Sequence, residues 1–400
     1  MIQSTQKTGP LTDIRVLELG QLIAGPFCGQ LLADMGADVI KIEPPGTGDP
    51  LRVWGRDGFP MWWAVTARGK RTITANLRED AGREIVRKLA LEADILIENF
   101  RPGTMERWGL GWDDLSAINP GLIMVRVSGY GQTGPYAKRP GYASVGEAMG
   151  GLRYVMGEAD RKPSRAGVSI GDSLTGTFAC VGALAALHHR EKTGEGQVVD
   201  ASIYESVLAV MEGLVGEHAL GGYTRERTGS VLPNIAPSNI YDARDGMVII
   251  AANQDTVFRR LCEAIGRPEL ADDTRYATHI ARGERQAELD GIINAWTGER
   301  SVEEIDALMV EHSVPVGRVY TAADMLEDPH YKARESIVEV ASERFGQIPM
   351  QAATPRFSAT PGSIRWAGPE RLGSHTEEVL TELLDLTPEQ IDKLRQSGIV

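Results

Sequence analysis

A single acidic residue, Asp172, stands in the small-residue stretch GVSIGDSLTG (167–176), just before a segment with helical periodicity. Asp side chains at a helix start accept hydrogen bonds from unpaired backbone N–H groups, so Asp172 is a candidate helix cap. The same N–H groups and the helix dipole would keep a carboxylate ionised and would stabilise an oxyanion formed beside it. Gly171 and Gly176 would let other backbone segments approach. Two compatible interpretations are open, a cap and a carboxylate nucleophile.

Two other residue patterns, a set of glycines and a pair of histidines, do not have the spacing that their chemistry requires. Gly20, Gly25 and Gly29 follow a predicted strand, but they do not have the G-x-G-x-x-G spacing of a dinucleotide site. His188 and His189 are adjacent in a predicted helix, where their side chains diverge by about 100°, so they do not predict a joint metal site. We therefore disfavour a nucleotide-dependent dehydrogenase and expect no metal.

Composition narrows the function further. The chain has 400 residues and a net charge of −13, which argues against nucleic-acid and membrane-surface binding and requires a local basic patch for any anionic ligand. Its three cysteines, Cys28, Cys180 and Cys262, cannot all pair within one chain, which fits a reducing compartment. The N-terminal residues have no apolar signal core, and the run 178–187 is about half of a membrane span. We expect a cytoplasmic protein.

Alternating strands and helices must position Asp172. The patterns predict strands at 14–20, 38–43, 94–100 and 122–131, and helices at 24–37, 81–93 and 174–192; residues 196–211 read as a strand followed by a helix. Such alternation predicts an α/β fold with a largely parallel sheet covered on both faces.

The composition changes near residue 222. A loop-like segment, a hairpin around Asp245-Gly246 and several helices follow, and strand-like 336–341 and helix-like 375–384 lie beyond them. We therefore predict a large α/β domain interrupted by a smaller α+β domain. The predicted parts are residues 1–222 (N-terminal part of the large domain), 223–330 (small domain) and 331–400 (C-terminal part, returning to the large domain).

Five segments in order resemble the class III CoA-transferases, the CaiB/BaiF family, over almost the whole chain from about residue 10 to Val400. They are AGPFCGQLLADMGADVIKIEPPGTGDPLR (24–52), ENFRPGTMERWGLGWDDL (98–115), SGYGQTGPYAKRPGY (128–142), SIGDSLTGTFACVGALAAL (169–187) and LGSHTEEVL (372–380).

The resemblance implies an interlocked homodimer in which each chain has a Rossmann-like large domain and a small domain. It also implies that Asp172 is the nucleophile. The carboxylate attacks the donor thioester and passes through an anhydride and an aspartyl-CoA thioester, so thioester energy is conserved without ATP. Coenzyme A, as acyl-CoA, is then the substrate, together with a small carboxylic acid. Water must be excluded, because anhydrides hydrolyse.

The resemblance also implies a set of CoA contacts. These are Gln21, Ile23, Ala24, Ala75, Asn99, Phe100, Arg101, Arg107, Arg139 and Tyr142. Phe100 or Trp108 would flank adenine, and Arg107 would pair with a phosphate. The alternatives are solvated charges at Arg101, Lys138 and Arg139, and plain core at Phe100 and Trp108. Formyl-CoA transferase has an arginine after "KIE", where this chain has Pro44, so a different residue must bind that phosphate.

Two rival functions are open. An α-methylacyl-CoA racemase needs a histidine in a G-H-D stretch, where this chain has Gly141-Tyr142-Ala143. A non-catalytic acyl-CoA-binding protein would not need the G-D-S segment.

The sequence indicates the identity of the acid that accepts CoA less directly than it indicates the type of reaction. Residues 227–234 lack the glycine run of formyl-CoA transferase, which disfavours oxalate. We expect succinyl-CoA as the donor and a dicarboxylate such as glutarate, mesaconate or citramalate as the acceptor. A second carboxylate would need an arginine, and Arg52, Arg165 and Arg227 are unranked candidates.

Overall fold

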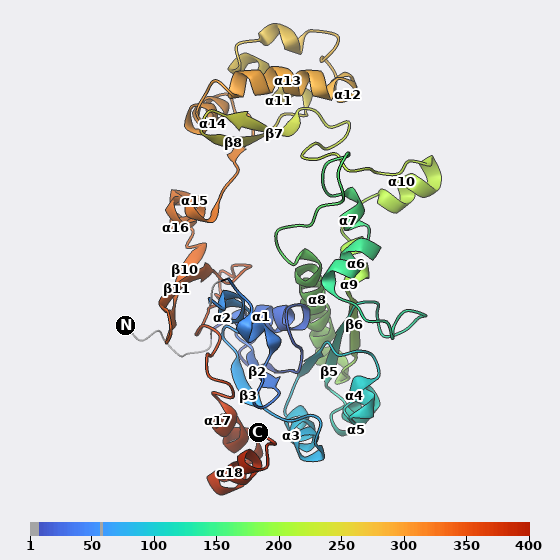
Figure 1. Cartoon of the computed structure of the whole chain (residues 1–400), viewed down its shortest axis with the longest axis vertical. Coiled ribbons are helices and arrows are strands. Elements are labelled where there is room, and N and C mark those ends of the chain that lie inside the picture. The colour runs from blue at the N-terminus through green and yellow to red at the C-terminus, as the bar shows by residue number, and fades with distance from the viewer. Residues whose placement is uncertain (1–7, 57–58) are drawn as a thin grey trace. The chain divides into compact units, whose positions relative to one another are not determined.

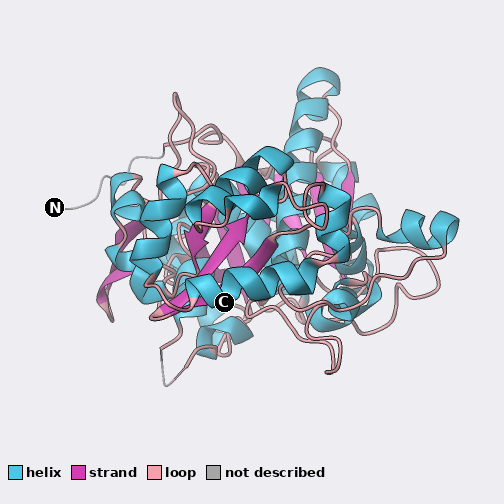
Figure 2. Ribbon diagram, turned by 90° about the horizontal axis from the view of Figure 1, so that it is seen from above, coloured by secondary structure: helices cyan, strands magenta, loops and turns pink. Residues whose placement is uncertain are grey.

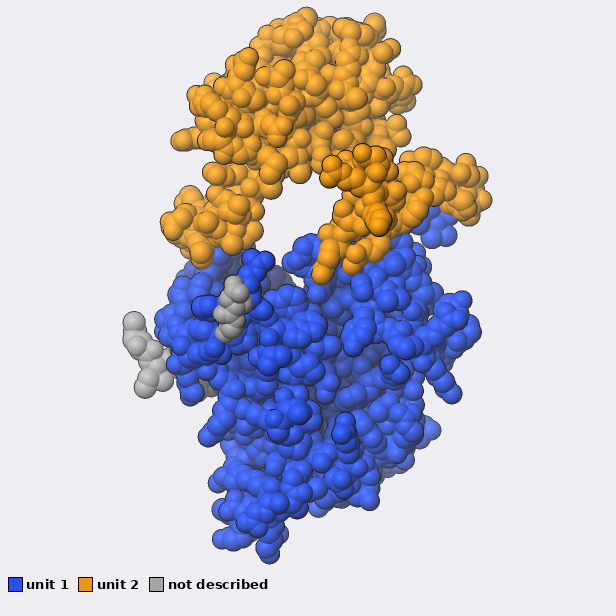
Figure 3. Space-filling model, viewed as in Figure 1, with its two compact units in different colours: residues 1–152, 166–215, 333–400 blue, residues 153–165, 216–332 orange. Residues whose placement is uncertain are grey.

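The computed structural model describes residues 8–56 and 59–400, and the chain divides into two compact units, coloured separately in Figure 3. Unit 1 comprises the chain up to Leu152 together with Ala166–Val215 and Ala333–Val400. Unit 2 comprises Arg153–Arg165 and Gly216–Lys332. Residues 153–165 therefore differ from the predicted assignment to the large domain, because their partners lie in unit 2: the N–H of Gly229, for example, donates to the carbonyl of Gly157.

A six-stranded sheet forms the centre of unit 1. Its strands are β1 (Arg15–Glu18), β2 (Asp38–Glu43), β3 (Arg71–Thr74), β4 (Ile95–Glu98), β5 (Ile123–Ser128) and β6 (Val198–Ser202). All neighbours pair in parallel, in the order β3-β2-β1-β4-β5-β6. The predicted parallel α/β sheet is confirmed.

Helices cover both faces of this sheet (Figure 2). Alternate strand residues enter different cores, because successive side chains of a strand point to opposite faces. Val16 packs with α1 (Ala24–Asp34) and α8 (Ile170–Thr193), whereas Leu17 packs with α3 (Asp80–Leu91).

Shorter elements complete unit 1. They are the 3-10 helix η1 (Pro50–Val53), α2 (Met61–Thr66), α4 (Thr104–Arg107), α5 (Trp112–Ile118), α6 (Ala143–Met149), α7 (Leu152–Val155), α9 (Ile203–Leu208) and α10 (Leu214–Gly221), of which α7 and α10 run on into unit 2.

The C-terminal segment returns to the sheet of unit 1 (Figure 1). The hairpin β10 (Ile337–Ser342) and β11 (Gly346–Gln351) packs on α2. Helix α17 (Thr376–Leu384) packs against β3, and α18 (Pro388–Gln396) packs on α17. The helix at 375–384 and the strand at 336–341 are confirmed, whereas β11 was not predicted.

Unit 2 has a core of its own. Its hairpin β7 (Ser238–Ala243) and β8 (Gly246–Ala251) confirms the predicted turn, and β9 (Val316–Arg318) pairs antiparallel with β8. The helical elements of unit 2 are α11 (Asp255–Ala264), η2 (Pro268–Ala271), α12 (His279–Glu284), α13 (Gln286–Thr297), α14 (Val302–Glu311), α15 (Ala322–Glu327) and α16 (Pro329–Ala333, whose last residue lies in unit 1).

Helix α8 determines where Asp172 lies. It starts at Ile170, four residues before the predicted start, so Asp172 lies inside its first turn. By length and composition alone α8 could cross a membrane. In this fold it packs against α1, β5 and β6, and core helices meet the same criterion.

Candidate active site

The carboxylate of Asp172 caps nothing. No side chain caps the start of α8 at Ser169, and Asp172 forms no side-chain hydrogen bond with any residue that the structure describes. The cap interpretation is therefore wrong. A half-buried carboxylate without donors keeps its lone pairs available for attack on an electrophile.

Burial, followed by the charge of Glu147, raises the pKa of Asp172 to about 6. This is opposite to the expectation that the helix start would favour the ionised form, because none of the N–H groups there reaches the side chain. Glu147 lies in α6, is 2% exposed, and accepts a hydrogen bond from the N–H of Gly171 at 3.2 Å. Sequence reasoning missed Glu147; its one signal is an isolated charge in the small-residue stretch 143–151.

Two glycines let α8 approach its neighbours. A Cβ on Gly171 would lie 2.9 Å from Cγ of Glu147, and one on Gly176 would lie 2.7 Å from the carbonyl oxygen of Ala24. The predicted close approach at both glycines is confirmed. Because Gly176 is one helical turn beyond Asp172, the predicted CoA-contacting residue Ala24 lies beside the turn that follows the carboxylate.

Asn99 fixes the loop between β1 and α1. Its Oδ1 accepts from the N–H of Gln21 and its Nδ2 donates to the carbonyl of Gln21, both at 2.8 Å. The next residue, Leu22, has a φ of +63°, and its N–H donates to Oδ1 of Asp49 at 3.1 Å. The structure thus brings predicted Gln21 and Asn99 together, with Asn99 as a support for the loop.

Lys41 tethers the start of the same loop. Its Nζ lies 3.0 Å from Oε1 of Glu18 and 2.8 Å from Oδ2 of Asp49, and it donates to the carbonyl of Gly20 at 2.8 Å. All three charged side chains are at most 1% exposed. Burial alone would lower the pKa of Lys41, but the neighbouring carboxylates raise it above its usual value, so the ammonium is retained.

Lys70 anchors the first turn of α1, which directly follows this loop. Its Nζ lies 2.6 Å from Oε2 of Glu18 and donates to the carbonyl of Pro26 at 2.7 Å. The two lysines share Glu18, so one buried charge network holds residues 20–26 at both ends. Such fully bonded networks rigidify the backbone that they contact.

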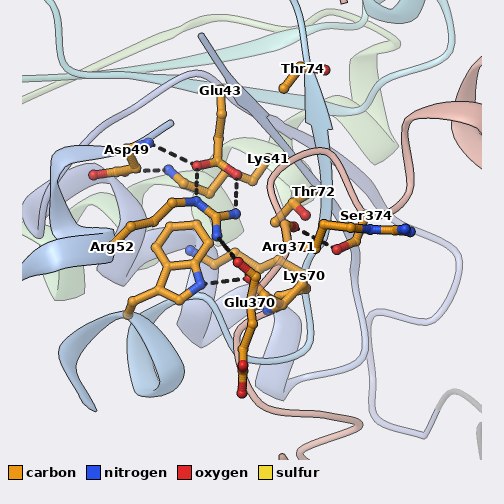
Figure 4. Close-up of polar contacts among 12 residues, drawn as sticks. Lys41, Glu43, Asp49, Arg52, Lys70, Thr72, Thr74, Glu370, Arg371 and Ser374 are labelled. Carbon is orange, nitrogen blue, oxygen red and sulfur yellow. Dashed lines mark hydrogen bonds and ion pairs between the residues drawn. The ribbon is translucent and has the colours of Figure 1, made fainter. Parts of the chain in front are cut away.

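Arg52 already forms an ion pair with a carboxylate of the protein, as Figure 4 shows. Its guanidinium contacts both carboxylate oxygens of Glu43, at 2.7 and 2.6 Å, and stacks 3.9 Å from the ring centroid of Trp63. Arg52 is therefore not available for a substrate carboxylate, which corrects its candidacy. Arg165 and Arg227 lie in unit 2 and stay predictions.

A pocket of about 420 Å³ lies at the carboxyl ends of four strands. Leu19, Pro44, Ala75 and Phe100 line it, and they follow β1, β2, β3 and β4. Ligands of open parallel sheets bind in this position. The remaining lining residues are Gln21, Ile42, Glu43, Pro45, Thr47, Asn76, Leu77, Arg78 and Trp108.

Three predicted CoA contacts, Gln21, Ala75 and Phe100, thus line one pocket. Phe100 and Trp108 meet edge to face with centroids 5.1 Å apart, and both line the pocket while packing on the core. Packing of these rings on the core is therefore confirmed, whereas the contact of either ring with adenine stays a prediction.

The other predicted contacts lie outside the lining of this pocket. Ile23 and Ala24 are at the start of α1; Arg101 and Arg107 are exposed, and Arg107 donates to Oγ1 of Thr104 at 2.9 Å. Arg139 stacks 3.7 Å from the ring centroid of Tyr136, and Tyr142 is 69% exposed. Their roles stay predictions. Within residues 8–56 and 59–400, no group of three or more His, Cys, Asp and Glu side chains is placed to hold a metal ion.

Comparisons with known proteins identify the family of this chain. Residues 11–376 match the family described as CoA-transferase family III. The chain is 55% identical over 403 residues to a succinyl-CoA--D-citramalate CoA-transferase of Chloroflexus aurantiacus, covering 100% of both chains. It is 37% identical to a succinate--glutarate CoA-transferase of Agrobacterium fabrum, over 96% of this chain and 98% of that one. A crystal structure of a CaiB/BaiF family protein from Brucella suis, 36% identical, superposes with a TM-score of 0.84 over 94% of this chain and 100% of that one. The chain belongs to CoA-transferase family III.

Proposed function

We propose that this CoA-transferase moves CoA from succinyl-CoA to a dicarboxylic acid, with D-citramalate as the first candidate acceptor. The observation that carries the substrate pair is the 55% identity, over the full length of both chains, to an enzyme named for these substrates. The Agrobacterium relative is named for succinate and glutarate, which supports a dicarboxylate acceptor.

Asp172 is the proposed nucleophile. Its carboxylate attacks the thioester carbonyl of succinyl-CoA, forms a mixed anhydride and expels CoA thiolate. The thiolate attacks the aspartyl carbonyl, which releases succinate and leaves an aspartyl-CoA thioester. The acceptor carboxylate attacks this thioester, and the thiolate then attacks the acceptor carbonyl of the second anhydride. One thioester is broken and one is formed, and Asp172 is regenerated. Its lack of hydrogen-bond donors supports this role.

The pocket at the carboxyl ends of β1 to β4, which we call the nucleotide pocket, is the proposed site of the adenosine of CoA. Its volume of about 420 Å³ lies within the range of ligand pockets, and the rings of Phe100 and Trp108 offer an apolar wall for a base. Gln21 joins this pocket to the tethered loop, and Ala24 at the loop's end lies against α8. The pantetheine arm is proposed to follow this loop toward Asp172.

The proposed assembly is an interlocked homodimer, with a Rossmann-like large part, in the cytoplasm and bound to neither nucleic acid nor membrane. The strand order β3-β2-β1-β4-β5-β6 supports the Rossmann-like description. Exposed apolar side chains on α6, α8 and α9 support a covering partner. They include Val145, Met149, Phe178, Val181 and Leu208.

The test is a panel of carboxylic acids, including D-citramalate, glutarate, mesaconate and oxalate, incubated with succinyl-CoA and read by mass spectrometry of the CoA products. We expect the citramalyl thioester to form fastest. In the absence of an acceptor, CoA should stay attached to Asp172, and Asp172→Ala should lower transfer by more than about a thousandfold. Exchange of the α-proton of an acyl-CoA without an adduct would instead support a racemase.

A further inference from the structure

A second pocket, of about 570 Å³, adjoins the nucleotide pocket; we call it the C-terminal pocket because residues near the chain end line it. Pro45 lines both pockets, and Thr74 of the C-terminal pocket directly precedes Ala75 of the nucleotide pocket. The two pockets are therefore neighbours at the ends of β2 and β3. A ligand that fills the first can extend into the second.

A tight turn places Arg371 at this pocket. The Oγ of Ser374 donates to the carbonyl of Arg371 at 2.6 Å, and Gly373 between them has a φ of +65°. The N–H of Thr74 donates to Oγ1 of Thr376 at 3.1 Å, which fixes the turn on the edge strand β3. Figure 4 shows Arg371, Ser374 and Thr74 in this region. The turn is therefore held in place on the sheet of unit 1.

The two arginines of the C-terminal pocket differ in what they contact. Arg395 lies 3.1 Å from Glu377 and 3.0 Å from Asp392, so two carboxylates already neutralise it. The guanidinium of Arg371, in contrast, has no hydrogen bond or ion pair within the described part of the chain, where Arg371 accepts a hydrogen bond through its carbonyl. In a protein with a net charge of −13, an unpaired arginine beside the hydroxyl groups of Thr74, Ser374 and Thr376 offers a local anion site.

The sheet order indicates which end of CoA reaches this site. Helix α8, which carries Asp172, packs against β5 and β6, whereas the C-terminal pocket lies at β3 on the opposite edge. The thioester must be at Asp172, so the part of CoA at the far edge is the part farthest from sulfur. In CoA this part is the adenosine with its ribose 3′-phosphate.

We propose that Arg371 binds the 3′-phosphate of CoA in the C-terminal pocket, while adenosine occupies the nucleotide pocket. The inference rests on the proposed function, because it takes acyl-CoA as the ligand. The planar guanidinium can donate two hydrogen bonds to phosphate oxygens, and the hydroxyls of Ser374 and Thr74 line the same space. Arg371 would then supply the phosphate contact for which Pro44 has no charge.

The test compares CoA with 3′-dephospho-CoA by titration calorimetry of the full-length protein. The wild-type protein should bind CoA more tightly than the dephosphorylated ligand. Arg371→Gln should weaken CoA binding by about tenfold or more, as expected for a lost charge-assisted hydrogen bond, and leave 3′-dephospho-CoA binding unchanged. Arg356→Gln is the matched control, because Arg356 is also exposed and lines neither pocket.

The thermal midpoint of Arg371→Gln should stay close to that of the wild-type protein, because the replaced guanidinium has no hydrogen bond or ion pair to lose in the described part of the chain. Equal weakening of both ligands by Arg371→Gln, or no change in either, would overturn the inference while leaving the proposed function intact. Equal affinity of the wild-type protein for CoA and 3′-dephospho-CoA would also overturn the inference and leave the proposed function intact. If the wild-type protein bound neither ligand, the proposed function would fail as well.

Discussion

At the scale of single residues, the proposed nucleophilic role of Asp172 depends on what surrounds its carboxylate. A carboxylate that is half-buried, without donors and beside Glu147 keeps its proton to an unusually high pH. The same surroundings leave the ionised form poorly solvated, which favours attack on a carbonyl carbon once the proton is lost. Glu147 contacts α8 through the N–H of Gly171, so it also positions the first turn.

The pKa of about 6 at Asp172 predicts the acid limb of the pH profile. Because a raised carboxyl pKa means that the proton is retained up to that pH, kcat/KM for succinyl-CoA should fall about tenfold per pH unit below pH 6. Glu147→Gln keeps an oxygen acceptor for Gly171 but removes the charge, so the limb should move to lower pH. Initial rates measured from pH 4.5 to 8 give both profiles. An unchanged limb in Glu147→Gln would show that its charge does not act on Asp172.

At the scale of elements, the segment 20–26, which comprises the loop before α1 and the first turn of α1, is held by charges as well as by packing. Lys41 and Lys70 reach its two ends from strand β2 and from the residue before β3, and both contact Glu18 on β1. Breaking a buried ion network by removal of one partner leaves an uncompensated charge. The network therefore couples the stability of unit 1 to the geometry of the proposed CoA loop.

Lys41→Met should lower the free energy of unfolding by about 3–5 kcal/mol, because it leaves Asp49 buried without its ammonium partner and leaves Glu18 with Lys70 alone. Urea unfolding followed by circular dichroism measures the change. Lys393→Met is the control, since Lys393 is exposed, and it should change the free energy of unfolding by less than about 0.5 kcal/mol. Equal stabilities of the two variants would contradict the role of the network.

Gly176→Ala should destabilise the contact between α1 and α8. The new Cβ would lie 2.7 Å from the carbonyl oxygen of Ala24, which requires the helices to separate. Overpacking of this kind costs about 1–3 kcal/mol. Gly291→Ala is the matched control, because a Cβ there meets nothing within 4 Å and alanine favours the helix α13 by about 1 kcal/mol. In thermal unfolding, Gly176→Ala should lower the midpoint and Gly291→Ala should raise it. A shift of the midpoint in the same direction for both variants would refute the packing argument.

At the scale of the whole molecule, unit 1 leaves apolar side chains exposed on α6, α8 and α9. Phe178 and Val181, on the helix that carries Asp172, are 39% and 57% exposed. Contiguous exposed apolar side chains mark interaction surfaces. A second copy of the chain on these helices would also exclude water from the region of the proposed anhydride.

The protein should therefore be a homodimer that does not dissociate on dilution. Mass photometry or light scattering at nanomolar protein should give twice the chain mass of 43.4 kDa. Val181→Asp should disturb assembly, because it places a charge on the apolar face. A matched control is Glu195→Asp, which keeps the charge at an exposed position beyond the end of α8. A monomer at nanomolar concentration would rule out interlocked chains.

The sequence by itself was sufficient to predict the features that depend on residues close together along the chain. Alternating apolar strands and amphipathic helices indicated the parallel sheet, because burial on both faces leaves that pattern in each segment. The small-residue stretch around Asp172 singled out this residue, and Gly171 and Gly176 indicated close helix contacts. The five family-like segments pointed to the CoA-transferases, to which the chain belongs.

Only the tertiary structure decided the features that depend on distant partners. Burial beside Glu147 raises the pKa of Asp172, whereas the helix start was expected to lower it. The carboxylate of Glu43 already pairs with the guanidinium of Arg52. The turn at Arg371 reached the sheet edge through Thr376, 302 residues beyond its partner Thr74. Desolvation and Coulomb interactions act through space, so residue types and local periodicity do not determine them; the packing of the folded chain does.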